Sequence, residues 1–171
     1  MTSWPAIVLI AILVIVSLRY YIPLLLSRAA WIQQDQGTYD LARTYLHQAI
    51  AIERVAAFFT FSRTGLGLQY GNLGSLYKKQ GKWRQAIEAY TIAVNCLEGT
   101  RNGKRNAAPY YSMLGEVYLA NGYKLEGLKN LDKSQEFFEL SAKTETGEDL
   151  QHTLQCLEKI TEMRAEAQQA N

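Results

Sequence analysis

Residues 72–90 read NLGSLYKKQGKWRQAIEAY, and this stretch decides the fold. Small and large apolar residues stand among charged ones at fixed steps, a pattern that predicts two helices joined by a tight turn. A small residue lets the two helices cross closely, an aromatic residue fills the space beside the crossing, and a glycine ends the first helix in a left-handed conformation. The positions that carry the pattern are Leu73, Gly74, Tyr77, Gly81, Ala86, Tyr90 and Ala93.

The same offsets recur in two other parts of the chain. The later copy consists of Leu114, Gly115, Tyr118, Gly122, Gly127, Leu131 and Ser134. An earlier copy keeps its second half, Gly37, Ala42, Leu46 and Ala49, while Ala29 and Ala30 stand at its leucine and glycine positions. One such helix pair cannot bury its apolar face alone, so the pairs must stack. We therefore expect an all-α fold built from about three helix pairs.

The spacing of the copies predicts the organisation of the chain. Repeats are expected at about 23–54, 67–98 and 108–139, within an array over residues 23–145. Gly74 and Gly115 are 41 residues apart, which exceeds the roughly 34 residues that are common for a repeat of two helices. The excess is assigned to insertions at 55–66 and 98–107. Residues 146–171 predict a further helix that caps the array, with an apolar stripe of Leu150, Leu154, Leu157, Ile160 and Met163. A partner-binding helix is the alternative interpretation of that stripe.

These motifs resemble the tetratricopeptide repeat, whose pattern is Leu-Gly-x-x-Tyr followed by Gly, Ala, an aromatic residue and Ala. The match is good in 67–98, fair in 108–139 and degenerate in 23–54. The resemblance implies a right-handed α-solenoid that binds other proteins through a groove lined by the first helix of each repeat.

The N-terminal stretch from Trp4 to Leu18 reads WPAIVLIAILVIVSL and contains no charged residue. With Arg19 near the boundary and the apolar residues that follow it, the stretch is long enough to span a bilayer. Residues 1–22 are therefore predicted to form a single-pass anchor, with residues 4–22 in the lipid. A cleaved signal peptide and a buried helix of a soluble domain are the alternatives. Because Arg19 and Arg28 follow the span and no basic residue precedes it, the array is expected on the cytoplasmic or stromal side.

No pattern of catalytic, cofactor-binding or metal-ligating residues was found in the sequence. A phosphate-binding glycine loop, paired histidines and a nucleophilic triad are all missing, so a non-enzymatic protein without a cofactor is expected. Cys96 and Cys156 are sixty residues apart and are expected to be free thiols. The formal net charge of +2 gives no indication of nucleic-acid binding.

Two sets of residues are candidates for protein binding. Groove positions of the first helices hold Gly71, Asn72 and Ser75, and Ser112, Met113 and Glu116. Cations near the turns and the predicted loop are Lys78, Lys79, Lys82, Arg84, Arg101, Lys104 and Arg105. They could meet anionic lipid or acidic loops of a partner, or belong to ordinary solvated turns. Phe58, Phe59 and Phe61 are expected to pack between the first two repeats, the alternative being a partner-binding or membrane-resting edge.

The arrangement as a whole resembles the small membrane-anchored tetratricopeptide proteins of cyanobacteria and plastids that assist photosystem I assembly. The resemblance is carried by WPAIVLIAILVIVSLRYYIPLLL and by the repeats around NLGSLYKKQG and MLGEVYLANG. It implies a thylakoid membrane protein whose partners are photosystem I subunits or assembly intermediates. A general bacterial membrane-anchored adaptor and a regulatory subunit of another membrane complex are the alternatives.

Overall fold

A computed structural model describes residues 4–60, 62–100 and 102–169, apart from the side chains of residue 6 and residues 10–19. The described residues form seven helices and no strand, so the predicted all-α class is confirmed. The chain divides into two compact units, Met1–Ser62 and Arg63–Asn171, which are described separately.

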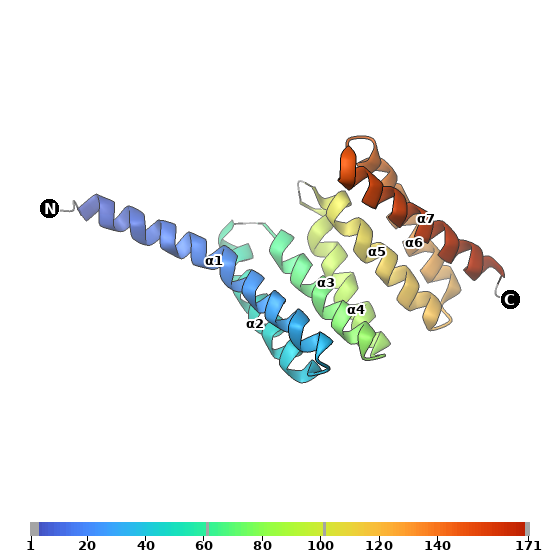
Figure 1. Ribbon diagram of the computed structural model, residues 1–171, viewed down its shortest axis with the longest axis horizontal. Helices are drawn as coiled ribbons and strands as arrows, with labels where there is room; N and C mark the ends of the chain where they lie inside the picture. Colours follow the sequence, from blue (N-terminus) through green and yellow to red (C-terminus); the bar gives the residue numbers. More distant parts are fainter. Residues whose placement is uncertain (1–3, 61, 101, 170–171) are drawn as a thin grey trace. The chain divides into compact units, whose positions relative to one another are not determined.

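The first unit is a pair of packed helices, α1 (Trp4–Asp35) and α2 (Tyr39–Thr60). Figure 1 shows α2 running back along the C-terminal half of α1. The small residues Ala30 and Ala42 are 3% and 0% exposed, and Leu46 and Ala49 are also buried. These are the positions of the degenerate first copy, so this copy is a helix pair with alanine where later repeats use glycine.

Helix α1 continues without a break through the predicted boundary between residues 22 and 23. Pro23 lies inside the helix, and the Ser27 hydroxyl donates a hydrogen bond to its carbonyl at 2.8 Å. The predicted division at this point therefore does not coincide with a helix end. Most of the predicted membrane span, residues 10–19, has side chains outside the described part of the structure. Among the residues that are described, no helix has the length and apolar character needed to cross a bilayer.

The second unit stacks five helices: α3 (Thr64–Lys79), α4 (Trp83–Glu98), α5 (Gly103–Ala120), α6 (Lys124–Ala142) and α7 (Gly147–Gln169). Each helix packs against the next along the chain (Figure 1). The predicted insertions are largely helical, because α2 continues to Thr60 and α5 begins at Gly103. The longer period thus reflects longer helices, and the segment 98–107, which was expected to be a loop, is helical from Gly103 onward.

Three turns of the same kind join the two helices of each pair. Gly37, Gly81 and Gly122 have φ values of 77°, 65° and 79°, as expected for the left-handed residue after a helix. After Gly81, the Lys82 amide donates to the Tyr77 carbonyl at 2.9 Å, while the Gly81 amide donates to Lys78 at 3.0 Å. These two bonds form a Schellman motif, and the same pair of bonds closes the other two turns. The predicted role of Gly81 and Gly122 is confirmed.

The glycines in the helices mark close crossings with a common register. A Cβ on Gly74 would lie 2.7 Å from the Tyr90 ring, and one on Gly115 would lie 2.8 Å from Leu131. Gly74 is eight positions before Lys82, the residue after the turn glycine, and Tyr90 is eight positions after it. Gly115 and Leu131 have the same spacing on either side of Tyr123. The two helices are therefore aligned in the same way within each pair, which follows from the turn that both pairs share.

Helix α7 covers the end of the array with part of its predicted stripe. Ile160 is 1% exposed, and Leu157 and Met163 pack against the same core. Leu154 is 52% exposed, and the neighbouring Thr153 is buried in its place. Elsewhere on α6, Lys133 contacts Glu98 of α4 at 2.6 Å and donates to the Tyr111 hydroxyl of α5 at 2.7 Å. Burial alone would lower the pKa of Lys133, but these hydrogen bonds raise it.

Candidate interaction surface

The candidate site is the surface of the second unit that is formed by the solvent-exposed sides of α3, α5 and α7. Helices α3 and α5 are the first helices of their pairs, α7 follows the last pair, and α5 contacts both of the others. The hydrogen-bonded turns and the glycine crossings fix the spacing of the helices, so the surface is held by the fold. Two cavities lie on it, one near the start of α5 and one near its end.

The cavity near the start of α5 has a volume of about 280 Å³ and a mixed lining. Its apolar lining includes Leu68 of α3 and Pro109 and Tyr110 of α5, and its polar lining includes Asp149 and His152 of α7. Burial raises the pKa of Tyr110, so its phenol is neutral at ordinary pH. The cavity can therefore contact a side chain that has both an apolar part and a hydrogen-bonding group.

The cavity near the end of α5 is larger, about 600 Å³, and lies between α5 and α7. Its apolar lining comes from Leu119 and Ala120 on α5 and from Met163 and Ala167 on α7; the remaining lining residues are Glu116, Gly122, Lys124 and Glu166. A concave, mostly apolar site with a few charged groups is typical of sites that accept a ligand or a partner side chain.

The predicted groove residues divide into exposed and internal positions. Asn72 is exposed and Ser112 is half-buried on this surface. Gly71 is buried under the Tyr110 ring, which lies so close that a Cβ at position 71 would collide with it. Ser75 lies 3.0 Å from the Tyr90 hydroxyl, and Glu116 is paired with Lys78 of α3 at 2.5 Å. Ser75 and Glu116 therefore also hold neighbouring helices together.

The predicted cationic patch is largely neutralised within the second unit. Arg84 pairs with Glu88 at 3.3 Å, and Lys104 lies 3.9 Å from Glu136. Lys79 is exposed, Lys82 is half-buried at the start of α4, and Arg101 lies outside the described residues. Lys104 and Arg105 belong to α5 instead of a loop. The expected loop position of Lys104 and Arg105 was therefore wrong, and both lie near carboxylates of the same unit.

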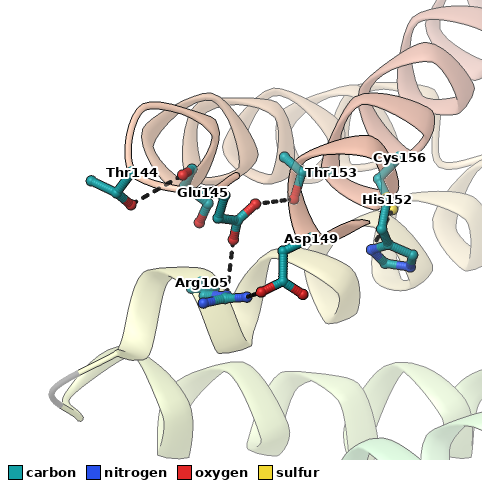
Figure 2. A network of polar contacts seen from close by, with 8 residues as sticks. Arg105, Thr144, Glu145, Asp149, His152, Thr153 and Cys156 are labelled. Carbon is teal, nitrogen blue, oxygen red and sulfur yellow. Dashed lines mark hydrogen bonds and ion pairs between the residues drawn. The ribbon is translucent and has the colours of Figure 1, made fainter. Parts of the chain in front are cut away.

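Arg105 is at the centre of a polar network that joins α5 to α7 (Figure 2). Its Nε lies 2.9 Å from Glu145, whose side chain is 5% exposed, and its Nη2 lies 3.2 Å from Asp149. The Thr153 hydroxyl donates to the other Glu145 oxygen at 2.5 Å. A buried carboxylate is stable when such donors satisfy it, so Arg105 positions the start of α7.

Other parts of this surface could not be located from sequence spacing alone. Tyr110 and Glu145 were not selected, because they contact residues that are distant in the sequence, Gly71 and Arg105. A signal was present for Tyr110: Gly67, Gly71 and Gly74 follow one another at helical steps on α3. Among the described residues, no group of three or more His, Cys, Asp and Glu side chains could hold a metal ion.

Comparison with known proteins agrees with this arrangement. The tetratricopeptide repeat family matches residues 69–105, which cover most of α3, all of α4 and the start of α5. The crystal structure of BtubC (BKLC) from P. vanneervenii is similar, with a TM-score of 0.65 at 17% sequence identity. The match covers 89% of this chain and 60% of that chain, so it spans less than two thirds of the length of that chain. No curated protein sequence matches this chain.

The helical repeat fold and the match over residues 69–105 make this chain similar to tetratricopeptide-like helical repeat proteins. Its repeats imply a scaffold for protein–protein interaction.

Proposed function

We propose that the chain is a non-enzymatic scaffold that binds client proteins on the α3, α5 and α7 surface. The observation that carries the proposal is the pair of cavities on one face, each lined by α5 and α7. The helices that form the face are fixed by internal contacts such as Lys78–Glu116 and the Arg105 network. A preformed surface loses little conformational entropy when a partner binds.

We propose further that residues 4–22 anchor the scaffold in a membrane, with the repeats on the cytoplasmic or stromal side. The support is the uncharged sequence from Trp4 to Leu18 and the placement of Arg19 and Arg28 after it. The layout resembles that of the photosystem I assembly proteins, so the proposed membrane is the thylakoid and the proposed clients are photosystem I subunits or assembly intermediates. Fixing the surface beside the bilayer would raise the effective concentration of such clients.

The test is co-purification of the tagged full chain from solubilised native membranes. Asn72→Arg places a large cation on the exposed side of α3, which contributes Leu68 to one cavity, and Asn95→Arg is the matched control, because Asn95 is exposed on α4, which contributes to neither cavity. We expect photosystem I subunits with the unaltered chain and with Asn95→Arg, and a clear loss with Asn72→Arg. Recovery of a transporter or another membrane complex in their place would refute the photosystem assignment. Equal recovery with both variants would refute the surface.

A further inference from the structure

Large apolar side chains are exposed at one end of the first unit. In α2, Val55 is 60% exposed, Phe58 77% and Phe59 73%, and in α1 Tyr20 and Tyr21 are 64% and 62% exposed. The Phe58 and Phe59 rings contact each other edge to face, with centroids 5.4 Å apart. Within the first unit Phe58 and Phe59 are exposed, their packing between the first two repeats stays a prediction, and Phe61 lies outside the described residues. Such a cluster of exposed aromatic residues marks an interaction site.

The register of the helix pairs places these residues at one level. In the second unit, contacting residues are equidistant from the residue after the turn glycine, as Gly74 and Tyr90 are from Lys82. The first unit has the same Schellman turn at Gly37, so its equivalent residue is Thr38. Val55 is 17 positions after Thr38 and Tyr21 is 17 positions before it. At about 1.5 Å per residue, Phe58 lies about 4.5 Å beyond that level, toward the N-terminus of α1. Figure 1 agrees, since α2 ends beside the middle of α1.

We infer that Phe58 and Phe59 insert into the membrane interface beside α1, so that two helices of the first unit contact the bilayer. The inference rests on the proposed anchor in residues 4–22. If that segment spans the bilayer, the level of Tyr20 and Tyr21 is the boundary between lipid and water. Tyrosine is enriched at this boundary, and phenylalanine on an adjacent helix reaches the acyl region just below it. The end of α2 lies at the same level, so Phe58 and Phe59 would contact the lipid.

The bilayer would cover the exposed apolar side chains at one end of the hairpin only. Both ends expose such side chains, since Trp31 and Leu41 near the turn are 64% and 42% exposed beside Thr38 and Asp40. The turn end and the Phe58 end are separated by most of the length of α2, about 33 Å for its 22 residues. Only the Phe58 end is level with the proposed span, so the turn end serves as the comparison.

The test uses an environment-sensitive fluorophore on single cysteines in the full chain, in a Cys96→Ala and Cys156→Ala background. The labelled positions are Phe59→Cys, Leu9→Cys in the proposed span, and Leu41→Cys at the opposite end of α2 as the matched control. Leu41 is 42% exposed, and Leu9 and Phe59 are also exposed. The protein is reconstituted into vesicles of phosphatidylcholine and phosphatidylglycerol, and lipids that carry a nitroxide near the headgroup or deep in the acyl chain serve as quenchers.

We expect the headgroup-proximal nitroxide to quench the label at position 59 several-fold more than the label at 41, and the deep nitroxide to quench the label at 9. Quenching at 9 without quenching at 59 would overturn this inference and leave the anchor in place. Absence of quenching at both 9 and 59 would refute the anchor, and the inference with it. A label at 59 that is shielded from aqueous iodide but not quenched by lipid would assign the patch to a protein contact and also overturn the inference.

Discussion

Replacing Arg105 with glutamine is expected to loosen α7, whereas the same change at Lys104 is not. The two residues are neighbours on α5, and their side chains are similarly exposed, 53% and 59%. Their partners differ. Arg105 binds Glu145, whose side chain is 5% exposed, and also Asp149, whereas Lys104 lies 3.9 Å from Glu136, which is 62% exposed.

The expected magnitudes follow from the burial of the partners. A hydrogen bond to a charged group contributes about 1.5–3 kcal/mol, and solvent screening of the half-exposed guanidinium reduces this value. Glu145 keeps its hydrogen bond from Thr153 in the variant. We therefore expect Arg105→Gln to lower the stability of the α5–α7 contact by about 1–2 kcal/mol, and Lys104→Gln to lower it by about 0–0.5 kcal/mol.

Hydrogen exchange of the full chain in mild detergent measures this difference locally. A loss of about 1–2 kcal/mol should increase the opening of α7 by a factor of about 5–30, while α3 and α4 serve as internal controls. The reasoning would be refuted if exchange in α7 were unchanged in Arg105→Gln. Equal acceleration in Lys104→Gln would refute it as well, because the burial of Glu145 would then have no effect.

Further predictions concern the connection between α4 and α5 at Gly99 and Gly103, the buried phenol of Tyr90, and the thiols of Cys96 and Cys156. A Cβ on Gly103 would collide with the carbonyl oxygens that end α4, so Gly103→Ala should lower stability to urea by about 1–3 kcal/mol, while Gly99→Ala, with open space around it, should raise it slightly. Equal urea midpoints for the two variants would contradict this packing. Burial raises the pKa of Tyr90 from 10.0 to about 12. Its contribution to stability is complete below pH 10 and is lost as the pH rises through about 12, and Tyr90→Phe should flatten that decline in unfolding curves measured between pH 9 and 12. An unchanged decline would show that other groups cause it. Both cysteines are free, and burial raises the pKa of each thiol. Cys156 should react with a thiol reagent faster than the buried Cys96, and the reverse order would contradict the packing of α4.

The repeat could be predicted from the sequence because its determinants are local. Gly81 and Gly122 adopt the expected left-handed conformation, and Gly74 meets Tyr90 across a single turn. Each of these features depends on residues fewer than twenty positions apart. Hydrophobic periodicity and turn chemistry report on such distances directly.

The helix corner at 98–107 was misjudged because its composition is that of a loop. The stretch EGTRNGKRN is rich in glycine, asparagine and charge, which favours a turn in the absence of other information. In the structure Gly103 starts α5 against the last carbonyls of α4, a contact that only a residue without Cβ permits. Packing against the preceding helix therefore overrides the local preference.

The ion pairs of the candidate surface were also beyond prediction from spacing. Lys78 and Glu116 are on helices of different pairs, and Arg105 meets Glu145 across a full helix pair. Their contact depends on the register between helices, which the pattern within one helix does not contain. Lys78 and Arg105, which were selected as partner-binding cations, are for this reason also parts of the internal framework.

The unbroken course of α1 through Pro23 makes the number of its residues a geometric parameter. Each residue added to a helix rotates everything beyond it by about 100° and advances it by about 1.5 Å. One residue inserted before Pro23 would thus rotate Ala30 by about 100° around the helix axis relative to the N-terminal segment. Seven inserted residues would nearly restore the original orientation and would mainly move Ala30 along the axis. The direction in which the first repeat faces around the α1 axis is therefore set by the number of residues in one continuous helix and not by a flexible linker.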